Sequence, residues 1–470
     1  MDRIIGRIEQ KAKLKSYISS DSSEFVVVYG RRRVGKTFLI REYFNNTFDF
    51  QMTGLANAGM KEQLINFHAA IQKYNPLVIP FANTWFDVFQ QLIELLEQSK
   101  SKRKLVFIDE LPWLDTPKSG FLSAFEHFWN DWASARRDIL LIVCGSATSW
   151  ITGKLLNNKG GLHNRITSRM SIAPFTLGEC EEYLQSRNIV LNRYQIVESY
   201  MIFGGIPYYL SLLEKGMSLA QNIDNLFFNE SGELCNEFKN LYASLFKNHG
   251  NYVKIVEALA QKAKGLSRDE ILSLSKLTDG GSTTRILQEL EECKFIRKYN
   301  ALDKKTKDGL YRLTDFYTLF YFKFIQKNEF NDTHFWSTSI DSPQHRSWSG
   351  YAFEQVCLAH IDQIKRKLGI TGVQCKTASW RSRTAEPGAQ IDLLIERKDQ
   401  VINLCEMKYS SEKFSIDKNY SQTLRNKVSA FREETKTRKA IHITMVTTYG
   451  IKPNEYAGMI QNEVIMDDLF

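Results

Sequence analysis

The chain has 470 residues, of which 43% are hydrophobic and 24% charged, an ordinary composition for several folded domains. Its formal net charge of +9 favours an anionic partner, and nucleic acid is the obvious candidate, with a merely solvated surface as the alternative. It holds no run of about 18 apolar residues and no signal-peptide core at Met1–Gly6, so a membrane partner is not expected and the protein is predicted to be cytoplasmic. Its seven cysteines include no C-x-x-C pair, so neither a secreted disulfide framework nor a zinc site is expected.

A phosphate-binding loop is predicted near the start of the chain. The stretch Gly30-Arg31-Arg32-Arg33-Val34-Gly35-Lys36-Thr37, with Phe38 next, fits G-x-x-x-x-G-K-[ST] without a mismatch. An apolar run of strand type at 25–29 precedes it, and helical spacing follows. Lys36 would reach the β- and γ-phosphates, and the Thr37 hydroxyl can ligate Mg²⁺. The chain is therefore predicted to bind ATP with Mg²⁺.

Two further strands are expected to bring catalytic groups to this loop. The buried-type strand at 104–110 ends in Asp109 and Glu110. We expect Asp109 to hold the metal and Glu110 to orient and deprotonate the attacking water, so that ATP is hydrolysed. The apolar strand at 139–146 has Ser146 at its tip, which is in place to sense the γ-phosphate. The plain alternatives are an ordinary acidic strand end and an ordinary polar strand tip.

The order of these elements resembles AAA+ and STAND-like P-loop ATPases, and more narrowly the archaeal-type ATPase family, over residues 1 to about 235. Five segments carry the resemblance, at 4–9, 30–37, 108–114, 144–147 and 203–210. It implies that Ile5 and Arg7 contact the adenine base and that the last segment, with Pro207, belongs to a helical lid over the nucleotide.

The resemblance also implies an arginine that senses the γ-phosphate after the third strand, supplied by the same or a neighbouring subunit of a homo-oligomer. Arg165 and Arg169 are both candidates, and a solvated surface is the alternative for both. The three cations at 31–33 could face nucleic acid, another subunit or acidic groups on the same surface, and the sequence does not choose among these.

Three helices and a hairpin are expected behind the ATPase region. The first helix is predicted at 252–260, the second begins after a Ser267 cap, and the third is predicted at 282–293. The two strands are predicted at 295–299 and 309–313. This pattern looks like a winged helix. Because its third helix offers few cations, DNA contact through the lysines at 304–307 and transmission of nucleotide state are equally open roles. The aromatic segment at 315–349 is read as a buried connector and linker.

The last region carries a second group of chemically active residues. A strand at 391–396, a polar turn and a return strand at 401–408 predict a hairpin, in which Glu406 and Lys408 share a face. If the register brings Asp392 opposite them, the site could hold Mg²⁺ on Asp392 and Glu406, and Glu354 on a preceding helix could add an oxygen. A solvated hairpin face is the alternative.

This arrangement is similar to the PD-(D/E)XK nuclease superfamily. The acidic residue of that motif would correspond to Asp392, and its Glu-x-Lys to Glu406 and Lys408. The preceding helical Glu would correspond to Glu354. No proline stands directly before Asp392, where Gln390 and Ile391 are found instead.

The predicted fold class is α/β. The predicted domains are a P-loop ATPase core with a parallel sheet at 1–175, a helical lid at 176–236, a winged helix at 237–314, an aromatic helix and linker at 315–349, and a small α/β nuclease-like domain at 350–470. Two functions stay open. The first is a DNA-associated ATPase that couples nucleotide state to a Mg²⁺-dependent DNA endonuclease; the second is a nucleotide-dependent switch whose last domain binds a partner without cutting.

Overall fold

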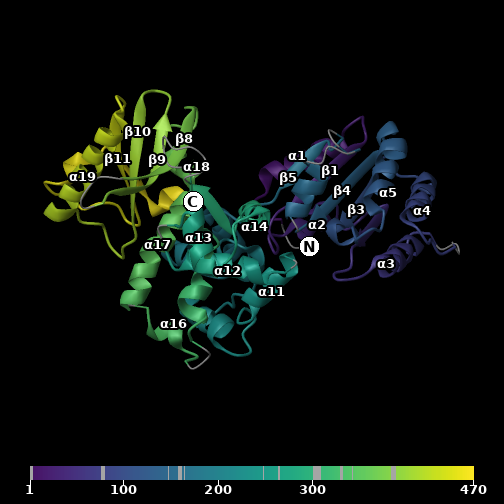
Figure 1. Cartoon of the computed structure of the whole chain (residues 1–470), viewed down its shortest axis with the longest axis horizontal. Coiled ribbons are helices and arrows are strands. Elements are labelled where there is room, and N and C mark those ends of the chain that lie inside the picture. Colours follow the sequence, from purple (N-terminus) through teal and green to yellow (C-terminus); the bar gives the residue numbers. More distant parts are fainter. Residues whose placement is uncertain are drawn as a thin grey trace. The chain divides into compact units, whose positions relative to one another are not determined.

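The computed structural model describes residues 4–75, 80–146, 148–156, 161–162, 165–246, 248–262, 265–299, 309–328, 332–340, 342–382 and 388–470. The lysines at 304–307 lie outside these residues. The backbone divides into two compact units, Met1–Pro174 and Phe175–Phe470 (Figure 1). The finer domain boundaries within the second unit stay predictions. Among the described residues no helix is both long and apolar enough to cross a membrane, and all seven cysteines are free thiols.

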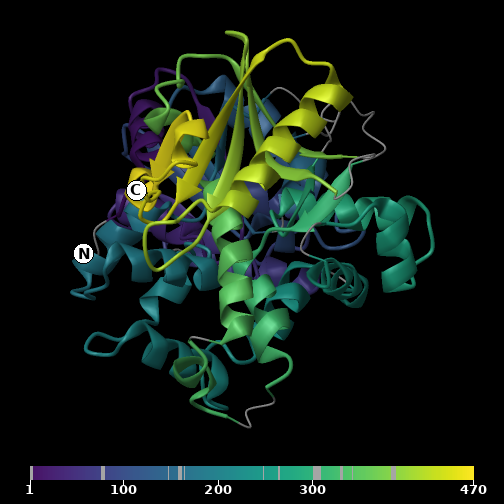
Figure 2. The same cartoon turned by 90° about the vertical axis from the view of Figure 1, so that its left-hand side faces the viewer.

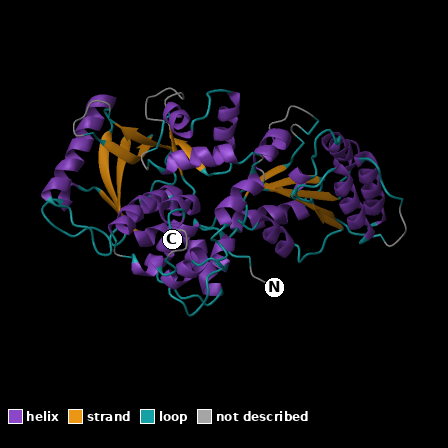
Figure 3. Cartoon of the chain, turned by 60° about the horizontal axis from the view of Figure 1, so that its bottom comes forward, coloured by secondary structure: helices purple, strands orange, loops and turns teal. Residues whose placement is uncertain are grey.

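The first unit is built on a five-stranded parallel sheet in the order β2-β3-β4-β1-β5. Its strands are β1 (Glu24–Tyr29), β2 (Phe50–Thr53), β3 (Lys104–Asp109), β4 (Ile139–Gly145) and β5 (Ser168–Ser171). Its helices are α1 (Ile8–Ile18), α2 (Lys36–Tyr43), α3 (Met60–Gln72), α4 (Trp85–Gln98), α5 (Phe121–His127) and α6 (Thr148–Trp150). The expected α/β fold with a parallel sheet is confirmed, and Figure 3 shows helices along the strands of this unit.

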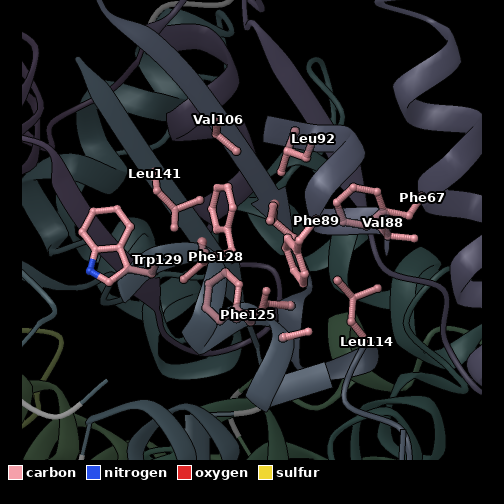
Figure 4. Close-up of a cluster of buried hydrophobic side chains, with 14 of the residues drawn as sticks. Phe67, Val88, Phe89, Leu92, Val106, Leu114, Phe125, Phe128, Trp129 and Leu141 are labelled. Carbon is pink, nitrogen blue, oxygen red and sulfur yellow. The ribbon is translucent and has the colours of Figure 1, made fainter. Parts of the chain in front are cut away.

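Aromatic and branched side chains fill the space between the sheet and the helices α3, α4 and α5. Figure 4 shows Phe67, Phe89 and the strand residue Val106 in this cluster, to which Phe125 and Trp129 also belong. β3 and β4 are buried along their whole length, as a sheet covered on both faces requires. Because all strands run in one direction, their carboxyl ends lie at one edge of a rigid layer.

The second unit begins with helices of the predicted lid. These are α7 (Leu177–Ser186), α8 (Arg193–Phe203), α9 (Pro207–Ser211) and α10 (Leu219–Ile223), and α11 (Glu237–Leu245) follows. Side-chain capping boxes fix the starts of α7, α8 and α10, which matches the local polar residues before each.

The expected three helices and hairpin are present. They are α12 (Gly250–Ala260), α13 (Arg268–Ser275, capped by Ser267), α14 (Gly281–Glu292), and the antiparallel strands β6 (Ile296–Tyr299) and β7 (Leu310–Leu313). We call residues 250–313 the hairpin module. The aromatic connector that follows, α15 (Phe316–Phe320) and the π-type turn at 321–325, buries most of its rings, as predicted.

A second five-stranded sheet forms the last part of the chain, in the order β12-β11-β10-β9-β8. It contains β8 (Cys375–Arg381), β9 (Gln390–Arg397), β10 (Val401–Lys408), β11 (Ala440–Thr447) and β12 (Asn462–Ile465), with antiparallel pairs from β8 to β10 and parallel pairs from β10 to β12. The helices are α16 (Phe335–Thr338), α17 (Pro343–Ala359), α18 (Ile361–Lys367) and α19 (Lys418–Thr435). Figure 2 shows α19 lying across this sheet, where Phe431 packs edge-on against Trp380.

The predicted lid helices pack directly on the last part of the chain. The backbone N–H of Leu177 at the start of α7 donates to Nε2 of His360, 3.0 Å away. Arg193 of α8 pairs with Asp467, and the neighbouring Tyr194 stacks on Tyr409 with ring centres 5.0 Å apart. Lid helices and C-terminal sheet therefore belong to one packed body.

Candidate functional site

The phosphate-binding loop joins β1 to α2 at the carboxyl edge of the first sheet. Gly30 has φ 148°, and a Cβ at this position would lie 2.3 Å from the carbonyl oxygen of Ile172, so only glycine fits. Gly35 has φ 86° and caps the first turn of α2. The N-terminus of α2 therefore opens on the loop, where its N–H groups and partial positive charge favour an anion.

Lys36 is held against the loop itself. Its ammonium donates to the carbonyl oxygens of Gly30, at 3.0 Å, and Arg31, at 2.9 Å. The side chain is buried, which places the charge inside the loop rather than in solvent.

The two expected metal ligands lie in contact. Thr37 Oγ1 donates to Asp109 Oδ2 at 2.7 Å, although the residues are 72 positions apart in the chain. A hydroxyl and one carboxylate are oxygen donors that Mg²⁺ accepts when substrate phosphates complete its ligand shell. The residues present therefore fit a nucleotide-bound Mg²⁺.

Glu110 is oriented by Ser146. Its backbone adopts a left-handed conformation with φ 47°, and Ser146 donates to its carboxylate from Oγ, at 2.6 Å, and from the backbone N–H, at 3.2 Å. The sequence predicted Ser146 as a γ-phosphate sensor; the structure adds a contact to the candidate base. The strand order explains it, because β4 lies between β3 and β1.

The remaining predicted nucleotide contacts are spread more widely. Arg7 has φ 54° and donates to the carbonyl of Val34 at 3.2 Å, so the opening segment is tied to the loop. Ile5 is buried and Phe38 is 42% exposed. Pro207 is the first residue of α9 in the second unit.

The structure does not distinguish between Arg165 and Arg169 as the arginine that senses the γ-phosphate. Arg165 and Arg169 are both exposed, and Arg169 donates to the carbonyl of Leu156 at 3.3 Å. In the loop, Arg31 is buried while Arg32 and Arg33 are half-buried, so these three cations do not form one solvated face.

Comparison with known proteins agrees with this geometry. Residues 6–213 match the family described as an ATPase domain predominantly from Archaea. The chain contains an archaeal-type ATPase domain. This supports nucleotide binding and ATPase activity for the region that holds the loop, Asp109 and Glu110.

One relative spans most of the chain. It is the uncharacterized protein MJECL04 of Methanocaldococcus jannaschii, 25% identical over 393 residues, which are 83% of this chain and 83% of the relative. Among solved structures, the Walker-type ATPase paby2304 of Pyrococcus abyssi has a TM-score of 0.47 at 17% identity and covers 68% of this chain and 96% of its own. The Aeropyrum pernix ORC2 protein, in ADPNP and ADP complexes, has a TM-score of 0.43 at 14% identity and covers 70% and 96%.

The C-terminal residues meet on β9 and β10. The antiparallel ladder pairs Leu404 with Leu394 and Cys405 with Leu393. The next positions along the strands are Glu406 and Asp392, so the register brings the two acidic residues level, as the hairpin prediction required. Glu406 is only 7% exposed, so its side chain does not lie on a solvated face. β10 is instead a central strand covered on both sides.

Both of these carboxylates are already paired with cations of the protein. Asp392 Oδ1 lies 3.1 Å from Nη2 of Arg312 on β7 and accepts a further hydrogen bond from Gln390. Glu406 Oε1 lies 2.6 Å from Nζ of Lys427 on α19.

The other two predicted residues lie in the same neighbourhood. The ammonium of Lys408 lies over the ring of Tyr420, 4.8 Å from its centre, and Tyr420 in turn donates to Glu406. Burial, and next the Asp392 carboxylate, raise the pKa of Glu354 on α17 to about 8. A protonated carboxyl is a poor ligand for Mg²⁺.

The expected metal site is therefore not formed here. Within the described part of the chain, no group of three or more His, Cys, Asp or Glu side chains is arranged to hold a metal ion. Asp392 and Glu406 are neutralised by Arg312 and Lys427, and the raised pKa of Glu354 favours its protonated form. These residues do not fit a bound Mg²⁺ in this conformation, and no chemical step is derived through one.

Sequence reasoning missed Arg312 and Lys427. Arg312 stands alone between the apolar residues Tyr311 and Leu313 on a short strand and is 3% exposed. A single charge within an otherwise apolar strand was the available signal, since such a residue needs a partner when buried. Nothing local in α19 distinguishes Lys427 from its exposed neighbours.

A cavity of 360 Å³ lies beside Asp392. Its walls include Arg297, Lys298 and Tyr299 of β6 on one side and Thr377 of β8 with Asp392 on the other. The hairpin module thus forms one wall of the C-terminal site.

Proposed function

We propose that this protein is a DNA-associated ATPase whose nucleotide state controls its C-terminal domain. The observation that carries the proposal is the pairing of Thr37 with Asp109 and of Ser146 with Glu110 at the mouth of the phosphate-binding loop. These contacts place the metal ligands and the candidate base next to each other, as hydrolysis of a nucleoside triphosphate requires.

Each residue of this site has a defined task. The N–H groups of the loop and the start of α2 hold the phosphates, and Lys36 exchanges its two carbonyl partners for the β- and γ-phosphates. Mg²⁺ bound by Thr37 and Asp109 would offset the charge that develops on the phosphate oxygens. Glu110, held by Ser146, orients a water molecule for in-line attack and accepts its proton. Arg165 or Arg169 supplies the additional positive charge.

The coupling to the C-terminal domain is supported by how the predicted lid is packed. Leu177, Arg193 and Tyr194 belong to lid helices, and each contacts a residue of the last part of the chain. A lid that changes its position with the bound nucleotide would carry this domain with it, because the two share one packed body.

DNA association is supported by charge. The net charge is +9, and the cavity beside Asp392 has Arg297 and Lys298 in its wall. Cations placed in this way favour phosphate contacts. The exposed cation of the third helix, Arg285, lies near Glu289 instead, at 3.7 Å.

A second candidate function is favoured by one specific observation. Because Asp392 and Glu406 are paired with Arg312 and Lys427, the C-terminal domain in this conformation has the features of a binding module rather than of a charged nuclease site. The protein would then be a nucleotide-dependent switch that binds a partner, with nucleotide-dependent assembly of copies as its output.

One pair of assays separates the two functions. The purified chain is supplied with ATP and Mg²⁺ or Mn²⁺, with and without supercoiled and branched DNA, and ATP turnover and nicking are followed. Stimulated turnover together with nicking that Asp392→Ala abolishes supports the nuclease-coupled ATPase. Turnover that ignores DNA, with an oligomer size that changes between ATP and ADP, supports the switch. No turnover under any condition would refute both.

A further inference from the structure

Arg312 reaches from the hairpin module into the carboxylate site of the C-terminal sheet. Its Nη2 lies 3.1 Å from Asp392 Oδ1, and its side chain is 3% exposed against 25% for that of Asp392. The guanidinium also lies 4.9 Å from the centre of the Tyr299 ring. Both Arg312 and Tyr299 come from β6 and β7, whereas Asp392 comes from β9, so the contact joins two parts of the fold.

Part of the Arg312 side chain has no partner. Its Nε is buried without a hydrogen-bond acceptor in the described structure, and so is the hydroxyl of Tyr299. A guanidinium has five N–H donors and stays charged at every accessible pH, so it cannot relieve this burial by losing a proton. An unpartnered buried donor costs free energy. If Arg312 served stability alone, we would expect its Nε to have an acceptor.

The guanidinium of Arg312 lies on the Asp392 carboxylate, where a divalent cation would bind. Mg²⁺ and Mn²⁺ bind carboxylate oxygens directly, at about 2.0–2.1 Å for Mg²⁺. A guanidinium on Asp392 and a divalent ion on the same oxygens would repel each other at this partly buried position. Occupancy by one therefore excludes the other.

The second cation of the site is held less firmly. Lys427 pairs with Glu406, and its side chain is 18% exposed, more than that of Arg312. Its long flexible stem allows the ammonium to turn toward solvent. Arg312 cannot do this alone, because its strand fixes it between buried neighbours.

We propose that Arg312 is a built-in counter-ion of Asp392, and that its guanidinium stands on this carboxylate in place of a divalent cation and keeps such ions off it. The inference rests on the proposed function in so far as this site is the output of the protein. It adds what occupies the site: the hairpin module supplies the cation on Asp392, so this carboxylate does not take a divalent ion while Arg312 is in place.

The connection to the lid is short. β7 ends at Leu313, and three residues later Phe316 packs against Tyr200 of α8 with ring centres 5.3 Å apart. Tyr351 of α17 donates to the carbonyl of Leu313 at 3.4 Å. A shift of the lid helix α8 would therefore act on the segment that carries Arg312.

The test measures metal binding, without DNA or nucleotide, on the full-length protein. Mn²⁺ is titrated into wild type, Arg312→Gln and Arg312→Gln/Asp392→Asn, and bound Mn²⁺ is followed by electron paramagnetic resonance. We expect Arg312→Gln to gain a site that binds Mn²⁺ about 10–100-fold more tightly than wild type, the range over which residues around a metal site change its affinity. The double variant should lose this site, so ions bound near the phosphate-binding loop cancel in the comparison.

Two control variants separate the effect of the charge at position 312 from a general effect of removing an arginine. Arg312→Lys keeps the charge and should bind Mn²⁺ no better than wild type. Arg397→Gln removes an arginine that pairs with Asp399 at the far end of β9, five residues from Asp392 and hence about 16 Å away along the strand, and should change nothing.

Loss of Arg312 leaves Asp392 without its cationic partner and will destabilise the fold, which supplies a second measurement. Mn²⁺ should raise the melting temperature of Arg312→Gln and leave those of wild type and of the double variant unchanged. Equal Mn²⁺ affinity in wild type and Arg312→Gln, or binding that persists without Asp392, would overturn the proposal. Because neither assay involves ATP or DNA, this result is independent of whether the protein hydrolyses ATP or cuts DNA.

Discussion

His360 is expected to make the second unit sensitive to mild acid. The side chain is 1% exposed, its Nδ1 donates to the carbonyl of Val356 at 2.8 Å, and its Nε2 accepts the N–H of Leu177. Both ring nitrogens are satisfied only when the imidazole is neutral. Burial accordingly lowers the pKa of His360 from 6.5 to about 4.

The sign and size of the effect follow from this shift. In the unfolded chain the imidazole takes up a proton near pH 6.5, while in the folded protein it stays neutral down to about pH 4. The stabilisation is complete above pH 6.5 and is lost as the pH falls toward 4. A shift of this size corresponds to about 3 kcal/mol of unfolding free energy, of which about 2 kcal/mol is lost by pH 5.

The assay is denaturant unfolding of the full-length protein at pH 7.5, 6 and 5. The tryptophans Trp336, Trp348 and Trp380 report on the second unit, and the N-terminal ones on the first. His360→Gln should lower stability at pH 7.5, because the amide does not reproduce the spacing of the two ring nitrogens that bond to Leu177 and Val356, and should remove this part of the acid loss.

The matched control is His334→Gln, since His334 is exposed. This variant should keep the acid loss of the wild type. A wild-type free energy of unfolding that stays flat between pH 7.5 and 5, or an acid loss that His360→Gln leaves intact, would refute the assignment of His360 as a neutral acceptor for the N–H of Leu177 in α7.

Three further predictions concern the ATPase domain. Glu110→Gln should keep its affinity for ATP and lower turnover by about 100-fold or more, because it removes the proton acceptor, whereas Glu94→Gln on the exposed face of α4 should leave turnover unchanged; single-turnover hydrolysis measures both. Ser146→Ala should lower turnover by less than Glu110→Gln with ATP affinity unchanged, since the backbone N–H still holds the carboxylate; wild-type turnover in this variant would contradict the positioning role. Gly30→Ala would put a Cβ 2.3 Å from the backbone carbonyl oxygen of Ile172, at a residue whose φ is 148°. It should lower the melting temperature of the first unit by roughly 4–8 °C, as measured by calorimetry. The control Gly153→Ala, where a Cβ meets no atom within 4 Å, should leave the melting temperature unchanged.

The sequence alone determined the ATPase half to a useful depth. The loop at 30–37, the buried strands before Asp109 and Ser146, and the helix after the loop are local patterns, and local patterns follow from the chain's own periodicity. The hairpin of β9 and β10 was also within reach, because a short polar turn fixes which residues stand level.

Tertiary structure alone decided the pairings that give these residues their tasks. Thr37 meets Asp109, Arg312 meets Asp392, and His360 meets Leu177 across separations of 72, 80 and 183 residues. No local pattern specifies such contacts, because they depend on strand order and on how helices pack on a sheet. For that reason the sequence predicted a metal site at Asp392 and Glu406, whereas the packed fold places two of its own cations there.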